Sequence, residues 1–91
     1  MYEILPYTYR RAKSLKVTVQ PSMKEGKKID VYKNGVLICS VGDIRYLDFP
    51  MYRKLFGKQI AAEKKRLYKL RHASDRNVPG SAGWYADKLL W

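Results

Sequence analysis

The sequence has little from which a metal site or a disulfide could be built. Among its 91 residues there is one cysteine, Cys39, and one histidine, His72. A single cysteine cannot form an intramolecular disulfide, and two such residues are too few for a zinc site. We therefore expect no metal and no cofactor, and the cysteine content fits a reducing compartment.

Long hydrophobic runs are also missing. No stretch approaches the roughly 20 apolar residues that span a membrane. The first residues, MYEILPYTYRR, lack the apolar segment of a signal peptide. These absences predict an intracellular protein that is neither secreted nor inserted in a membrane.

Acidic residues are scarce. The chain has 8 Asp and Glu against 19 Lys and Arg, a net charge of +11. Such an excess typically indicates a polyanionic partner, most often nucleic acid and less often an anionic membrane or an acidic protein surface. Apolar residues make up 46% of the chain and aromatic residues 13%, which is enough for a core. The length predicts a single domain over residues 1–91.

The first half of the chain predicts a short helix and a strand. Thr8 is expected to cap a helix over residues 9–15. Val17 and Val19 then alternate with polar neighbours, as in a half-buried strand, and Pro21 is expected to end it.

The segment KKIDVYKNGVLICSVG predicts a two-residue β-hairpin. Ile29 and Val31 alternate with polar residues, and the apolar run VLIC follows the pair Asn34-Gly35. This pair tolerates the positive φ angles of a type I′ turn. The second strand is expected to end near Gly42.

From LDFPMY onward the pattern becomes helical. Asp48 is a suitable N-cap and Pro50 suits a first helical turn, so a helix is predicted over residues 50–56, ending near Gly57. The longest helix is expected over residues 58–73. Its apolar side should carry Phe56, Ile60, Leu67 and Leu70, and its opposite side Lys58, Lys65 and Lys69.

The chain ends in GSAGWYADKLLW, which predicts a short final helix opened by Ser81 or Gly83. Its apolar residues, Trp84, Tyr85, Leu89 and Leu90, have neutral neighbours and are expected to close the core as a lid. Together these elements predict an α+β fold. It consists of a small three-stranded antiparallel sheet with a central Asn-Gly hairpin, packed against a long basic C-terminal helix and short flanking helices.

Positive charge is concentrated in residues 53–76, which hold nine basic and two acidic residues, a net charge of +7. The three lysines of the predicted polar side lack carboxylates four residues away. Such a face can be merely solvated, but the excess favours contacts with phosphates. The predicted nucleic-acid or anion-binding residues are Lys58, Lys65, Arg66, Lys69, Arg71, His72 and Arg76.

The segment RHASDR leaves three interpretations open. Its cations can stabilise the end of the long helix through the helix dipole. Arg71, His72 and Arg76 can instead form an anion pocket. His72 beside Asp75 can act as a general base, but no carboxylate pair, phosphate-binding loop or nucleophile motif accompanies it, so no catalytic residue is predicted. Glu63 is expected to form an internal bridge to a Lys or Arg that fixes the packing of the helix.

The strings YKNG, DFPMY, GKQIAAEKKRLYKLRHASDR and GSAGWYADKLLW resemble a family of small basic proteins of nucleocytoplasmic large DNA viruses, the giant viruses of algae and amoebae. The resemblance covers about residues 28–91 and part of the N-terminal segment. It implies a viral source and a genome-associated or virion-structural role, and no catalytic residues.

The sequence therefore favours a non-enzymatic viral protein that binds nucleic acid, DNA more than RNA, in the host cytoplasm or nucleus or inside the virion. The alternative is a virion structural protein, a minor capsid or cement protein that contacts capsid proteins through Tyr2, Tyr7 and Tyr9. A lesser alternative is a small nuclease with His72 as the base.

Overall fold

The computed structural model describes residues 1–91 and is α+β, with one three-stranded antiparallel sheet and four α-helices. The predicted fold class is confirmed at this level. The chain divides into two compact units, Met1–Tyr46 (unit 1) and Leu47–Trp91 (unit 2). The expected single domain over residues 1–91 stays a prediction, because two compact units can belong to one domain.

Unit 1 begins with helix α1 (Pro6–Ser14), which starts earlier than expected. Leu5 occupies the N-cap position and Pro6 the first turn, where its missing N–H would be unpaired in any case. The predicted capping role of Thr8 is wrong, since Thr8 lies inside the helix and is fully buried.

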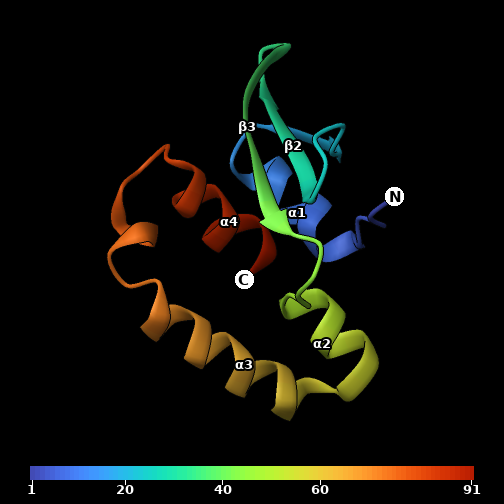
Figure 1. Cartoon of the computed structure of the whole chain (residues 1–91), viewed down its shortest axis with the longest axis vertical. Helices are drawn as coiled ribbons and strands as arrows, with labels where there is room; N and C mark the ends of the chain where they lie inside the picture. Colours follow the sequence, from blue (N-terminus) through green and yellow to red (C-terminus); the bar gives the residue numbers. More distant parts are fainter. The chain divides into compact units, whose positions relative to one another are not determined.

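The sheet of unit 1 has the order β1-β2-β3, so β2 is central (Figure 1). Its strands are β1 (Thr18–Pro21), β2 (Lys27–Lys33) and β3 (Val36–Asp43). Val19 lies opposite Val31, and Ile29 opposite Val41, and all four are buried. Alternate residues of a strand point to the same face, so Ile29 and Val31 form the apolar face of β2.

A turn at Asn34 and Gly35, with φ of 52° and 77°, joins β2 to β3. The apolar residues that follow are exposed rather than buried: Val36 by 66%, Leu37 by 51% and Ile38 by 37%. The pairing of β2 with β3 shifts register between Val31 and Tyr32, which lie opposite Cys39 and Leu37. Beyond the turn, β3 therefore presents apolar side chains that the core does not cover.

Asp30 is a buried carboxylate on β2. It accepts hydrogen bonds from the hydroxyls of Ser22 (2.5 Å) and Ser40 (2.6 Å) and from the backbone N–H of Met23 (3.1 Å). Burial acts to raise the pKa of Asp30, but these hydrogen bonds outweigh it and leave the pKa below its ordinary value. Two hydroxyls and a backbone N–H hold this carboxylate by hydrogen bonds.

Unit 2 starts with helix α2 (Phe49–Phe56), and the predicted cap is confirmed: the Asp48 side chain accepts a hydrogen bond from the backbone N–H of Met51 at 3.2 Å. Gly57 follows with φ of 91°, a value that favours glycine. It separates α2 from helix α3 (Lys58–Arg71), and Figure 1 shows the sharp bend between them. The helix α3 ends two residues before the predicted end at residue 73.

The packed side of α3 differs from the predicted one. Of the four residues predicted for the apolar side, Ile60 and Leu70 are 45% and 64% exposed, and Phe56, which belongs to α2, is 53% exposed. Leu67 is half-buried, whereas Ala61 and Tyr68 are buried. The side that packs carries Ala61, Lys65, Tyr68 and His72, at the spacing of four, three and four residues expected for one helix face. The pattern of apolar residues does not indicate this face, because Lys65 is counted as polar although its aliphatic stem can pack.

A short 3₁₀ helix, η1 (Asp75–Asn77), leads to the last helix, α4 (Ala82–Leu90). Of the two predicted starts of this helix, Ser81 and Gly83, the structure has Ser81 as the cap, since its side chain accepts from the backbone N–H of Trp84 at 3.2 Å. The long basic helix predicted over residues 58–73 corresponds to α3, with 14 residues, but it is not the last helix: the chain ends in α4, with 9, so a long basic helix at the C-terminus is not confirmed.

The final segment is largely buried, as the lid interpretation expects. Tyr85, Leu89, Leu90 and Trp91 are each no more than 8% exposed, while Trp84 is half-buried. Gly83 lies against η1: a Cβ added there would lie 2.8 Å from the carbonyl oxygen of Asp75. The close approach of α4 to η1 therefore requires a glycine at this position.

Candidate nucleic-acid interface

Five aromatic rings form a continuous row in unit 2. The neighbouring ring centroids are separated by 6.1 Å (Phe56–Tyr52), 6.2 Å (Tyr52–Trp91), 4.3 Å (Trp91–Tyr68) and 4.3 Å (Tyr68–His72). The planes of Tyr68 and Trp91 are only 8° apart, so these two rings are stacked. Trp91, the residue after α4, thus lies between a ring of α2 and a ring of α3.

Several lysines of unit 2 lie over aromatic rings. The ammonium of Lys65 is 4.7 Å from the ring centroid of Phe49, and that of Lys64 is 5.6 Å from Tyr52. Lys88 lies 5.8 Å from Trp84. These are cation–π distances. Part of the positive charge is therefore held against the aromatic side chains of the unit.

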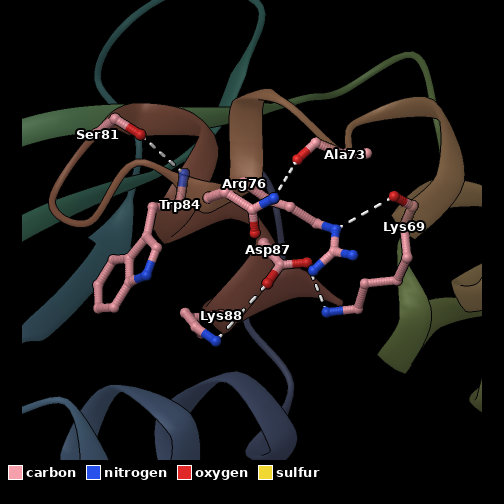
Figure 2. Close-up of polar contacts among 8 residues, drawn as sticks. Lys69, Ala73, Arg76, Ser81, Trp84, Asp87 and Lys88 are labelled. Carbon is pink, nitrogen blue, oxygen red and sulfur yellow. Dashed lines mark hydrogen bonds and ion pairs between the residues drawn. The ribbon is translucent and has the colours of Figure 1, made fainter.

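Lys69 is part of a buried ion pair that joins α3 to α4 (Figure 2). Its ammonium lies 2.5 Å from Asp87, whose side chain is 1% exposed, against 26% for Lys69. Lys88 is more distant from the same carboxylate, at 4.0 Å. A buried carboxylate needs a cation or several hydrogen bonds. Lys69, predicted to contact phosphates, is therefore engaged inside the fold.

Arg76 caps the end of α3. Its Nε donates to the backbone carbonyl of Lys69 at 3.1 Å (Figure 2), one of the carbonyls that a helix end leaves without an intrahelical partner. His72 stacks on Tyr68, and its Nδ1 lies 3.3 Å from Asp75. The segment RHASDR thus closes the helix end, in agreement with the interpretation of its cations as structural.

Arg71, His72 and Arg76 do not come together to form the expected anion pocket. Arg71 is exposed and its side chain makes no hydrogen bond or ion pair. Arg76 is directed to the carbonyl of Lys69, and His72 to Asp75. No group of three or more His, Cys, Asp or Glu side chains is placed to hold a metal ion.

Tyr68 lies at the centre of this arrangement. Burial, with a further contribution from the negative charges of Asp87 and Asp75, raises the pKa of its phenol to about 12, against the opposing effect of Arg71 and Arg76. The ring is therefore neutral at physiological pH, which suits its stacking between Trp91 and His72.

Glu63 pairs with an arginine as predicted, but the prediction that this bridge is internal and fixes helix packing is wrong, because the pair lies on the exposed side of α3. Arg66 donates to Glu63 at 2.5 Å, and both side chains are more than half exposed. The hydrogen bond from Arg66 lowers the pKa of Glu63. Arg66 is accessible to a ligand, but its charge is partly balanced.

The seven predicted binding residues thus fall into three groups. Lys58 and Arg71 are exposed without hydrogen bond or ion pair; Arg66 is exposed and paired; Lys65, Lys69, His72 and Arg76 are half-buried and engaged within the unit.

Two exposed cations were missed as site residues. Arg53 of α2 makes no hydrogen bond or ion pair, and Lys64 of α3 is exposed beside Tyr52. Neither has a carboxylate three or four residues away in the sequence. The absence of a nearby carboxylate is therefore the sequence signal that indicates both residues.

No protein-family model, curated protein or solved structure matches this chain. The resemblance to the giant-virus family stays a prediction drawn from the sequence motifs. None of the four α-helices is long and apolar enough to cross a membrane.

Proposed function

We propose that the protein is a non-enzymatic nucleic-acid-binding protein that contacts phosphates with the exposed cations of α2 and α3. The observation that carries this proposal is that Arg53, Lys58 and Arg71 are exposed and have no carboxylate partner. Cations that the fold does not use are available for phosphates, and each contact releases counterions from the nucleic acid.

The exposed cations of α3 include Lys64 as well as Arg71, and their spacing suits a phosphate backbone. Lys64 and Arg71 are seven residues apart on α3 and therefore share a face. Their separation along the helix axis is about 10 Å, which corresponds to about three phosphates at about 3.4 Å per nucleotide of one strand. Contacts of this kind give affinity but no sequence recognition.

The proposal is tested by titrating the protein against a labelled duplex DNA at several salt concentrations. We expect the binding constant to fall steeply between about 50 and 200 mM salt, because counterion release drives the contact. A flat dependence on salt, or no binding near about 50 mM, would contradict the proposal.

Matched variants localise the contact. Arg53→Gln, Lys58→Gln and Arg71→Gln together remove three charges from unit 2. Arg10→Gln, Lys13→Gln and Lys33→Gln remove three exposed charges from unit 1. The unit 2 variant should lose most of the affinity and the unit 1 variant much less. Equal losses would show that binding depends only on net charge.

A structural role in a virus particle is the second candidate. It is favoured by the exposed apolar residues after the turn of unit 1, Val36, Leu37 and Ile38, which suit a contact with capsid proteins. Of the tyrosines expected to make such contacts, Tyr9 is 51% exposed. Tyr2 and Tyr7 are half-buried beneath Lys28 and Arg11. Mass spectrometry of purified particles tests this role, and absence of the protein from them would remove it.

A further inference from the structure

Three large apolar side chains are exposed on either side of the bend between α2 and α3. Leu55 is 56% exposed, Phe56 53% and Ile60 45%, and Gly57 between them has φ of 91° (Figure 1). We call residues 53–60 the elbow. Exposed apolar surface can mark a place where a ligand binds.

The elbow carries only positive charge. Arg53 lies three residues before Phe56 on α2, so the two side chains are neighbours on the helix surface. Lys58 is the first residue of α3. No acidic residue occurs between Asp48, which is buried as the cap of α2, and Glu63, which is paired with Arg66. The chemistry of the elbow therefore matches an anionic ligand with apolar surface.

Phe56 is the exposed end of the aromatic row. Its ring is supported by Tyr52, with centroids 6.1 Å apart, and Tyr52 is in turn next to the buried Trp91. A ring fixed in this way loses little conformational freedom when a ligand stacks on it.

The ligand classes differ in what they offer the elbow. A duplex presents phosphates but keeps the faces of its bases stacked inside. An anionic lipid surface is usually bound by a longer amphipathic helix with a wide apolar face, whereas α2 has 8 residues and packs part of its surface. Single-stranded nucleic acid offers phosphates together with unpaired bases that stack on aromatic rings.

We propose that the elbow binds single-stranded nucleic acid, with Phe56 stacking on an unpaired base and Arg53 and Lys58 contacting the phosphates on either side. This inference rests on the proposed function and narrows its ligand from nucleic acid in general to unpaired strands.

The test compares a single-stranded oligothymidine with a duplex of equal length by fluorescence anisotropy. The wild-type protein should bind the single strand more tightly. Phe56→Leu, which keeps an apolar side chain but removes the ring, should weaken single-strand binding by about 5- to 100-fold, the range for one stacked base. It should change duplex binding by less than about 2-fold. Phe56→Trp keeps a ring and should keep the preference.

Leu70→Ala is the control, because Leu70 is an apolar residue of the same unit outside the elbow and is at least as exposed as Phe56, 64% against 53%. It should bind both ligands as the wild type does. A strand carrying the fluorescent base 2-aminopurine gives a direct readout: stacking on Phe56 quenches its emission, and Phe56→Leu should restore it. Circular dichroism of each variant establishes that it is folded.

Three outcomes would overturn the inference. In the first, the protein binds single strand and duplex equally, Phe56→Leu changes neither affinity, and Arg53→Gln with Lys58→Gln lowers both. This result would exclude the stacking site but agree with the proposed function. No binding to either nucleic acid would remove both. Binding to phosphatidylserine vesicles that depends on Phe56, without binding to oligothymidine, would assign the elbow to a lipid surface.

Discussion

The two units have similar lengths and charges, but one buried carboxylate in each, Asp30 and Asp87, is held in a different way. Unit 1 contains nine basic and four acidic residues and unit 2 ten and four, net charges of +5 and +6. In unit 1 the buried Asp30 is satisfied by the hydroxyls of Ser22 and Ser40. In unit 2 the buried Asp87 is satisfied by Lys69.

This difference shows why net charge does not locate a binding surface. Asp30 accepts its side-chain hydrogen bonds from hydroxyls and forms no ion pair with a lysine or arginine of unit 1. Asp87, in contrast, forms an ion pair with Lys69. Unit 2 also directs Arg76 to a helix end and Lys65 to an aromatic ring. The cations most available to a ligand are those that make no ion pair, helix cap or cation–π contact within the fold.

The largest effect is expected from removing the segment after Gly83. The truncation removes four buried apolar side chains, Tyr85, Leu89, Leu90 and Trp91. The lost burial is on the order of 6–10 kcal/mol, comparable to the whole stability of a small domain. Unit 2 should lose its cooperative thermal unfolding, measured by circular dichroism. Deletion of Met1, which is 97% exposed, is the control. A truncated protein that melts as the wild type does would contradict the lid.

The next effect concerns the ion pair of unit 2. Lys69→Met leaves Asp87 buried with only Lys88 nearby, at 4.0 Å, and should lower the free energy of unfolding by about 3–5 kcal/mol. Asp87→Asn should cost less, about 1–3 kcal/mol, because Lys69 is partly exposed and can turn to water. Chemical denaturation measures both. If Lys69→Met were as stable as the wild type, the pair would not be structural.

Alkaline pH should weaken unit 2 through Tyr68. Its folded pKa of about 12 lies above the ordinary value of 10.0. The stability that it contributes is therefore complete below pH 10 and is lost as the pH rises towards 12, by about 2–3 kcal/mol. Tyr68→Phe should remove this part of the loss, whereas the exposed Tyr9→Phe should not. The raised pKa of Tyr68 is checked by following tyrosinate formation by ultraviolet absorbance as the pH rises. A titration unchanged by Tyr68→Phe would contradict the raised pKa.

A smaller effect is expected at the contact of α4 with η1. Gly83→Ala would place a methyl group 2.8 Å from the carbonyl oxygen of Asp75. The overpacking should cost about 1–3 kcal/mol, against a gain of up to about 1 kcal/mol from the helix propensity of alanine. Thermal melting should therefore show a lower midpoint. A higher midpoint would mean that η1 moves away without cost.

Local features of the fold could be predicted from the sequence, and distant partners could not. The caps Asp48 and Ser81 were found because each bonds to an N–H three residues away. The predicted role of Thr8 was wrong because Pro6 sets the start of α1 earlier. No local pattern indicates that Lys69 is paired with Asp87, 18 residues later in the chain.

The candidate site was also only partly predictable from the sequence. The concentration of charge in residues 53–76 was visible in composition, but which cations remain accessible depends on packing. Lys65 reads as polar in a helical pattern, yet it lies on the packed face because its stem is apolar and its ammonium lies over Phe49. Arg71, six residues later, stays exposed.

The most direct test compares two neighbouring cations of α3 by the salt dependence of DNA binding. Lys69 is engaged inside the fold and Arg71 is not. At a temperature where circular dichroism shows both variants folded, Lys69→Met should keep the wild-type slope of the binding constant against salt. Arg71→Gln should reduce the slope by about 0.9, the value for one phosphate contact on a duplex. A slope reduced by Lys69→Met and unchanged by Arg71→Gln would contradict the account.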